Sequence, residues 1–176
     1  MSSRTTLFWL ALFGLIVLAG TSGSGLLGRD EDDRLEADVG GRVVRVVDGD
    51  TIRVRLDDPG QERTVRYIGV DTPESVAPGQ PVQCFGKAAS DFNSRLVAGK
   101  RVHLVLGRER RDRYGRLLAY VRVQGGPLVE DELLRLGYAR TLTIPPNDDR
   151  ARHFAMLERE ARSERRGLWG ACPVEG

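Results

Sequence analysis

Four carboxylate side chains stand in two short motifs of this 176-residue chain. Asp48 and Asp50 belong to the sequence Asp-Gly-Asp, and Asp71 and Glu74 belong to Asp-Thr-Pro-Glu. Carboxylates gathered without His or Cys are typical ligands of a hard divalent cation such as Ca²⁺ or Mg²⁺. Each motif alone is also a common turn sequence. The two motifs therefore indicate a metal site only if they meet at one place in the fold.

Arginines offer the positive charge that a phosphate-bearing partner would need. Arg66 lies inside an apolar run, on the same alternation as Ile68 and Val70, which is an unusual position for a charge. The segment Arg108–Arg116 contains five arginines among nine residues. Guanidinium groups beside a metal stabilise the charge that develops on phosphorus during phosphoryl transfer. A solvated basic turn is the alternative explanation of this segment.

Composition limits the classes of protein that these residues can belong to. A hydrophobic fraction of 40% excludes a wholly disordered chain, and two His and two Cys leave little room for zinc, haem or iron–sulfur chemistry. The three bases and six acids of residues 1–40 leave 24 bases and 19 acids, net +5, for residues 41–176. A mildly basic, arginine-rich domain suits a phosphate-bearing partner.

The N-terminal residues 1–27 predict a signal peptide. Arg4 precedes an apolar run at residues 7–20, and small polar residues follow it. The run is shorter than the roughly 20 residues of a membrane-spanning helix, although an uncleaved anchor that attaches the protein to a membrane remains the alternative. Residues 28–40 are predicted to be an acidic linker, and residues 41–176 a single domain. The protein is therefore expected to be secreted or held in the cell envelope.

Export affects the interpretation of the two cysteines. Cys84 and Cys172 form an even pair in a chain directed to an oxidising compartment, so a disulfide is expected. On the chain-entropy model, closing so long a loop contributes roughly 4 kcal/mol of stability. Two separate thiols are the alternative.

The elements that must position these residues follow from hydrophobic alternation. A hairpin is predicted where the Val-rich run 42–47 and the alternating run 51–56 flank the Asp-Gly-Asp turn. Further strands are predicted at residues 63–71, 101–106 and 117–123. Helices are predicted at 84–97, where Ala88, Phe92 and Leu96 form a stripe, at 128–136, and after Pro146 with Asn147 as N-cap. The pattern favours an α+β domain built on a partly closed, five-stranded barrel with about three helices.

One spacing places a condition on the predicted site. Arg66 and Asp71 are five positions apart, so a straight strand would place them on opposite faces. They converge only if the strand kinks or bulges, as strands of barrels often do.

Three ordered motifs resemble the thermonuclease, or staphylococcal-nuclease-like, family. They are Val-Val-Asp-Gly-Asp-Thr at 46–51, Arg-Tyr-Ile-Gly-Val-Asp-Thr-Pro-Glu at 66–74, and Asp-Arg-Tyr-Gly-Arg-Leu-Leu-Ala-Tyr at 112–120. The resemblance extends over about residues 41–170. It implies an OB-fold and Ca²⁺-dependent cleavage of phosphodiester bonds in DNA and RNA, with Ca²⁺ expected rather than Mg²⁺. The protein is expected to be a monomer.

The resemblance also implies roles for individual residues. The carboxylates of Asp50 and Asp71 and the carbonyl of Thr72 match the family's calcium ligands, and Glu74 matches the residue assigned as general base. Arg66 and Arg116 match the arginines that bind the scissile phosphate. Residues expected to support the ligands or bind substrate are Asp48 and Thr51, and Arg113 and Tyr114, respectively.

The chain departs from the family's pattern in one segment. The prototype has two tyrosines before its last helix, whereas residues 139–146 contain no aromatic side chain. The departure concerns substrate preference and the strength of binding, not the chemistry. Two other functions are considered beside an exported nuclease. One is a catalytically weak nucleic-acid-binding module of the same fold, and the other is a calcium-stabilised envelope protein.

Overall fold

The computed structural model describes residues 38–58, 60–75 and 82–173. The predicted signal peptide or anchor at 1–27, including its apolar run at 7–20, and linker residues 28–37 lie outside the described residues. Within the described ranges, no helix is both long enough and apolar enough to cross a membrane.

Five strands close into a barrel, which confirms the predicted α+β architecture. They are β1 (Asp38–Val46), β2 (Thr51–Leu56), β3 (Glu62–Tyr67), β5 (Arg101–Arg111) and β6 (Leu117–Val123). Their order is β1-β2-β3-β6-β5, and β5 pairs again with β1, so the barrel is fully closed. All neighbours are antiparallel except β3 and β6. Alternate side chains such as Ile52, Val54 and Leu56 fill the interior.

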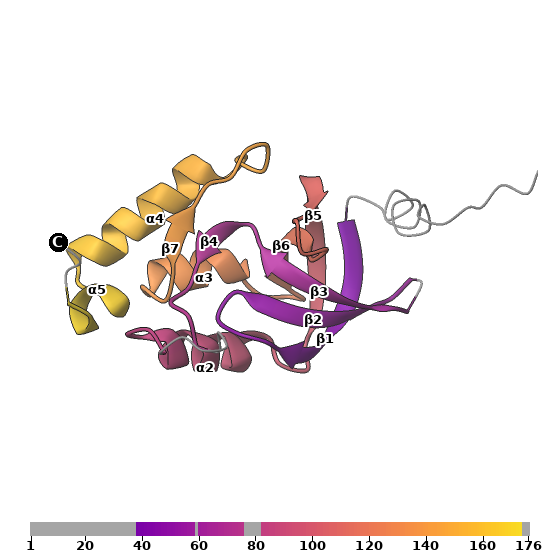
Figure 1. Ribbon diagram of the computed structural model, residues 1–176, viewed down its shortest axis with the longest axis horizontal. Coiled ribbons are helices and arrows are strands. Elements are labelled where there is room, and N and C mark those ends of the chain that lie inside the picture. The colour runs from indigo at the N-terminus through magenta and orange to yellow at the C-terminus, as the bar shows by residue number, and fades with distance from the viewer. Residues whose placement is uncertain (1–37, 59, 76–81, 174–176) are drawn as a thin grey trace, which may run out of the picture.

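Helices and a second, small sheet lie beside the barrel (Figure 1). The helices are α2 (Gly86–Val97), α3 (Val129–Arg135), α4 (Ala151–Ser163) and the short α5 (Leu168–Ala171). The small sheet pairs β4 (Gly69–Asp71) with β7 (Arg140–Leu142). Three longer helices agree with the expected number, whereas β7 and α5 were not predicted from the sequence. Both are short, and their positions depend on contacts distant in the sequence.

The first strand begins earlier than the predicted domain boundary. Residues 38–40, assigned from the sequence to the acidic linker, form the start of β1 and pair with β5. The acidic Asp38 and two successive glycines gave this stretch a poor strand signal. Pairing with β5 overrides that weak local preference.

The predicted strand 63–71 is two strands, β3 and β4, separated at Ile68. Gly69 has a φ of +83°, and a Cβ there would lie 2.5 Å from the Phe154 ring of α4, so glycine is required. The break changes the alternation, so Arg66 does not share a face with Val70 as the sequence pattern suggested. Arg66 instead lies opposite the buried neighbours Val65 and Tyr67.

Helix α2 begins at Gly86, two residues later than predicted, and presents a different face to the barrel. Its buried residues are Gly86, Ala89, Asn93 and Val97, not the predicted stripe. The predicted residues Ala88, Phe92 and Leu96 are only half-buried. The buried polar Asn93 concealed the correct face in a hydrophobicity pattern.

Two expectations near the last helix are wrong. Asn147 is not its N-cap, because α4 begins at Ala151 after Arg150. Asn147 instead bonds both backbone groups of Glu109: its Oδ1 accepts the N–H at 3.0 Å, and its Nδ2 donates to the carbonyl at 2.8 Å. That contact accompanies the extension of β5 to Arg111, beyond the strand predicted at residues 101–106.

Candidate active site

Asp50, immediately before β2, is the most firmly held carboxylate of the predicted site, and the residue is only 6% exposed. Its Oδ2 accepts hydrogen bonds from the backbone N–H of Thr72 at 2.9 Å and from the Thr72 hydroxyl at 3.0 Å. Its Oδ1 accepts one from the Thr51 hydroxyl at 3.0 Å. One carboxylate therefore joins the turn between β1 and β2 to the residue that follows β4.

Arg66, near the end of β3, lies between two carboxylates. Its Nε is 3.1 Å from Asp50 Oδ1, and its Nη2 donates to Asp71 Oδ1 at 3.0 Å. Its Nη1 donates to the carbonyls of Tyr67 and Val70, both at 2.8 Å. The side chain is 12% exposed. The break at Gly69 makes this arrangement possible, because it returns β4 to the face on which Arg66 lies.

Asp48 connects the same turn to α2. Its Oδ1 accepts the backbone N–H of Asp50 at 3.0 Å, and its carbonyl accepts Nδ2 of Asn93 at 2.9 Å. The Oδ1 of Asn93 in turn accepts the hydroxyl of Tyr67 at 2.9 Å. Burial, followed by the nearby charge of Asp50, raises the pKa of Asp48 to about 6. Asp48 thus acts on the site through the backbone of Asp50.

A turn at residues 112–116 holds Arg116. Asp112 Oδ1 accepts the backbone N–H groups of Tyr114 at 2.9 Å and of Arg116 at 3.0 Å, while its Oδ2 accepts Arg116 Nε at 2.6 Å. Burial acts to raise the pKa of Asp112, but these hydrogen bonds from Arg116 outweigh it, and the pKa is lowered. One ionised carboxylate therefore fixes both the backbone of the turn and the direction of the guanidinium group.

Arg66 and Arg116 line one cavity of about 460 Å³. Tyr114, 68% exposed, stands at its edge. The guanidinium carbons of Arg113 and Arg116 lie 4.8 and 5.5 Å from its ring centroid. Further wall residues include Leu142 and Ile144, in the segment that lacks aromatic side chains. The cavity thus combines cationic groups with an aromatic face and an apolar wall.

Glu74 lies close to this cluster but does not line the cavity as the structure describes it. Its Oε1 accepts the N–H of Ser75 at 2.9 Å. Its charge acts on Asp71: burial, chiefly, and then Asp50 and Glu74 raise the pKa of Asp71, against the opposing effect of Arg66. Glu74 therefore lies near enough to the metal-ligand candidate Asp71 to act on it electrostatically.

The predicted calcium ligands have the right chemistry for a hard cation. Asp50 and Asp71 approach the same guanidinium group, and each carboxylate acts electrostatically on the other. In the described ranges, no three Asp, Glu, His or Cys side chains gather closely enough to hold a metal ion alone. Two carboxylates and the Thr72 carbonyl would therefore leave several of the six to eight calcium positions to water and substrate.

Comparisons with known proteins identify the family of this chain. The family model described as staphylococcal nuclease homologue matches residues 64–171. The chain is 44% identical to the thermonuclease of Staphylococcus intermedius over 127 residues, 72% of this chain and 74% of the relative. It is 40% identical to the thermonuclease of Staphylococcus hyicus over 128 residues, 73% and 74% of the two chains. Endonuclease YncB of Bacillus subtilis is 42% identical over 127 residues, 71% of this chain and 59% of the relative.

This chain belongs to the staphylococcal nuclease family. The resemblance seen in the three sequence motifs is thereby confirmed. In this family member, sequence reasoning missed Asp112 as the support of Arg116 and Asn93 as the link between α2 and Asp48. The four-residue spacing of Asp112 and Arg116 was a usable signal for the first. Nothing local marked Asn93, because its partners lie more than twenty residues away.

Proposed function

We propose that this protein is an exported, Ca²⁺-dependent nuclease that hydrolyses phosphodiester bonds in DNA, RNA or both. Membership of the staphylococcal nuclease family makes it a phosphodiester hydrolase, and the relatives named thermonuclease and endonuclease support this reaction. The observation that carries the proposal is that Arg66 and Arg116 line the same cavity. Arg66 in addition forms ion pairs with both Asp50 and Asp71.

The two arginines would bind the scissile phosphate. A guanidinium group matches a phosphate with two parallel hydrogen bonds and keeps its charge at any physiological pH. Asp112 engages Arg116 through Nε, so this bond does not occupy the two outer nitrogens. Arg66 already donates from Nη1 to two carbonyls and from Nη2 to Asp71, so it is firmly held. It would act on the phosphate through its charge and its remaining Nη2 hydrogen, while the two-bond match would fall to Arg116. Preorganised charge of this kind stabilises the pentavalent transition state.

Glu74 would accept the proton of the attacking water. Its carboxylate is oriented by the N–H of Ser75. Asp50, Asp71 and the Thr72 carbonyl would hold Ca²⁺, which when bound offsets negative charge on the phosphate. Asp48 and Thr51 support this set by bonding the backbone and the carboxylate of Asp50.

Substrate would be held at the exposed edge of the cavity. The ring of Tyr114 offers a face for stacking on a base, and Arg113 donates to its hydroxyl at 2.7 Å. Leu142 and Ile144 stand on the wall of the same cavity, where they offer apolar contact without hydrogen bonds to a base. This pairing favours unpaired strands with little preference for base identity.

Export is part of the proposal. The apolar run at residues 7–20 would direct the chain across a membrane, or anchor it there if the segment is not cleaved. Cys84 and Cys172 form a disulfide, a bond that persists in an oxidising compartment. We expect a monomer in solution.

Cleavage of single-stranded DNA and of RNA by the purified protein tests the proposal. With Ca²⁺ both substrates are cut, and EDTA stops the reaction. Glu74→Gln lowers kcat roughly 100-fold or more, whereas Glu62→Gln, which removes an exposed carboxylate paired with Arg55, leaves it unchanged. Equal cleavage in EDTA would remove the metal from the mechanism. Binding that weakens with salt, without any cleavage, would favour the binding-module alternative.

A further inference from the structure

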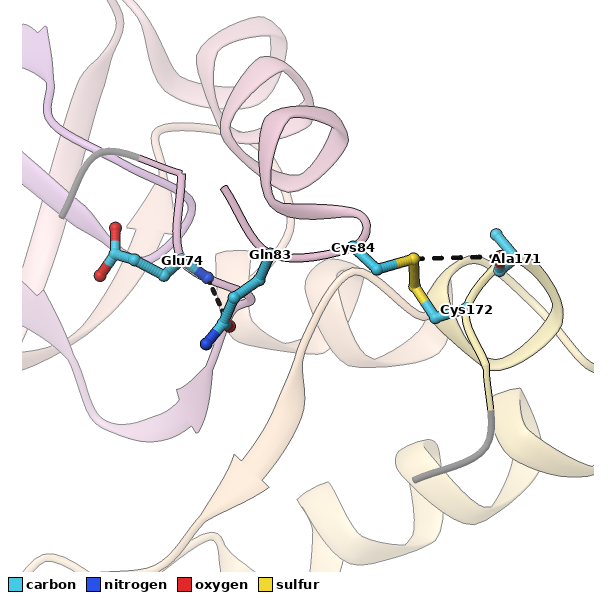
Figure 2. The surroundings of a disulfide bond; sticks show 5 residues. All are labelled: Glu74, Gln83, Cys84, Ala171 and Cys172. Carbon is cyan, nitrogen blue, oxygen red and sulfur yellow. Dashed lines mark hydrogen bonds between the residues drawn. A yellow bond between two sulfur atoms is a disulfide. The ribbon is translucent and has the colours of Figure 1, made fainter. Parts of the chain in front are cut away.

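The backbone of Glu74 is tied to Gln83. The Glu74 N–H donates to Oε1 of Gln83 at 2.8 Å, and the Gln83 N–H donates to the Glu74 carbonyl at 2.9 Å. Figure 2 shows the Glu74 carboxylate pointing away from Gln83, so these bonds hold the backbone and leave the functional group to the site. The position of the carboxylate thus depends on where Gln83 stands.

The start of α2 fits closely against Glu74. Gly86 donates its N–H to the carbonyl of Gln83 at 2.9 Å. A Cβ on Gly86 would lie 2.3 Å from the Glu74 carbonyl oxygen, so no larger residue fits without displacing Glu74. Phe85, immediately before Gly86, has a φ of +70°. Its ring centroid lies 5.3 Å from that of Tyr138. Residues 83–86 therefore form a brace for Glu74.

A covalent bond attaches this brace to the end of the fold. Cys84 is bonded to Cys172, 88 residues later and just beyond α5 (Figure 2). Cys172 donates its N–H to Leu168 at 3.0 Å, and Leu168 donates to Gly137 at 2.8 Å while its side chain is 2% exposed. The anchor Cys172 is thus tied through its backbone to a buried residue, Leu168. Gln83, Cys84 and Cys172 also line a cavity of about 480 Å³ together with Asp71.

We propose that Gln83 is a positioning residue for Glu74, and that the Cys84–Cys172 disulfide holds Gln83 in place, so that nuclease activity depends on the redox state of this pair. The inference rests on the role proposed above for Glu74. Cys84 is exposed, and the cavity beside it gives a small thiol reagent access to the bond.

The redox step is ordinary thiol–disulfide exchange with a dithiol such as dithiothreitol. A thiolate of the reagent attacks one cysteine sulfur, the cysteine S–S bond breaks, and a mixed disulfide forms. The second reagent thiol then displaces the remaining cysteine. Two electrons and two protons pass to Cys84 and Cys172, which become thiols, while the reagent becomes a cyclic disulfide.

A disulfide that only stabilises the fold makes a different prediction. Its loss would lower the melting temperature but leave the turnover of the folded enzyme unchanged. The proposed brace predicts a lower kcat in enzyme that is still folded, because misplacing a reacting group by about 1 Å can cost up to 100-fold in rate. It also predicts faster hydrogen exchange at the Glu74 amide.

The test measures both quantities on the full oxidised chain, well below its melting temperature. Gln83→Met removes the acceptor at nearly constant size, while Gln83→Glu retains an acceptor. Gln83→Met and the Cys84→Ser/Cys172→Ser protein are expected to lose protection of the Glu74 amide and about tenfold in kcat, with KM for single-stranded DNA within twofold. Gln83→Glu keeps the protection and most of the activity. Dithiothreitol lowers parent activity but does not affect the serine variant.

Arg166→Gln is the matched control. It removes the bond to the Arg135 carbonyl and the ion pairs with Glu160 and Glu164. The substitution therefore weakens contacts of α3 and α4 but leaves the backbone bonds that anchor Cys172 in place. We expect a lower melting temperature with normal kcat and normal Glu74 exchange. Unchanged Glu74 exchange in both Gln83→Met and the reduced parent would overturn the inference. Faster exchange with full activity would instead count against the role of Glu74 in the proposed function.

Discussion

Arg66 and Arg116 face the same cavity from supports of opposite kinds. Arg66 is nearly buried and bonds two carboxylates and two backbone carbonyls drawn from β3, β4 and the β1–β2 turn. Arg116 is 31% exposed and depends on one carboxylate, Asp112, within its own five-residue turn. The contacts of Arg66 therefore contribute to the fold as well as to the site, whereas Arg116 is held by a local turn at the edge of the barrel.

The difference separates two ways of preorganising positive charge. Around Arg66, precise placement is obtained by burial, so chemistry and folding stability share the same contacts. Around Arg116, a local turn fixes the guanidinium group, so its function can be lost while the fold remains. Substitutions at the two positions should therefore give equal losses of activity and very unequal losses of stability.

Arg66→Ala is expected to have the largest effect. It leaves Asp50 buried without its cation, and removing one partner of a buried ion pair costs about 3–5 kcal/mol of unfolding free energy. It also removes a phosphate-binding group, so kcat should fall roughly 100- to 1,000-fold. Urea denaturation and cleavage of single-stranded DNA measure the two losses. A variant that loses activity but keeps parental stability would show that Arg66 is no more structural than Arg116.

Arg116→Ala is expected to match that loss of activity without the loss of stability. The pair with Asp112 is only partly buried, and exposed ion pairs contribute about 0–1 kcal/mol, so the loss should lie far below that at Arg66. The same assays apply, and Arg122→Ala, on the far end of β6, serves as the control for removing an arginine. A stability loss as large as that of Arg66→Ala would contradict the distinction between the two supports.

Parts of this arrangement could be predicted from sequence because their signals are local. Hydrophobic alternation gave the barrel strands, and the Asp-Gly-Asp turn gave the hairpin that carries Asp50. The conditional expectation about Arg66 and Asp71 is also instructive. Their spacing required a kink, and the strand breaks at Ile68 and Gly69 so that the two side chains meet.

Other parts depend on partners that no local pattern reveals. Asn147 precedes a helix and has the side chain of a cap, yet it bonds Glu109, 38 residues away. Gln83 carries no apolar or charge signal, and its importance follows only from contact with Glu74. In each case a polar side chain satisfies a distant backbone group, a choice made by tertiary packing and not by propensity.

Glu130 tests whether burial alone couples a charged group to activity. The residue is fully buried, and Oε1 and Oε2 accept the N–H of Val121 at 3.0 and 3.3 Å. Burial raises the pKa of Glu130 to about 8, well above its ordinary value. Unlike Asp50, it has no ion pair in the described part of the chain. It also does not line the cavity that holds Arg66 and Arg116.

The sign of the pH effect follows from the raised pKa. The folded protein binds the Glu130 proton more tightly than the unfolded chain, so this contribution to stability is complete below about pH 4.5 and is lost as pH rises through 8. Glu130→Gln keeps an acceptor for Val121 and cannot ionise. Relative to the parent, its unfolding free energy should therefore rise between pH 5 and 9, by at most about 1.4 kcal/mol per pH unit.

Activity at pH 7 should change less than twofold, because the carboxyl lies apart from Arg66 and Arg116. If the parent and the variant lose stability in parallel across that range, Glu130 is not the group that titrates. If the variant also loses activity, a buried group outside the cavity affects the site. The contrast between Arg66 and Arg116 would then no longer separate stability from activity.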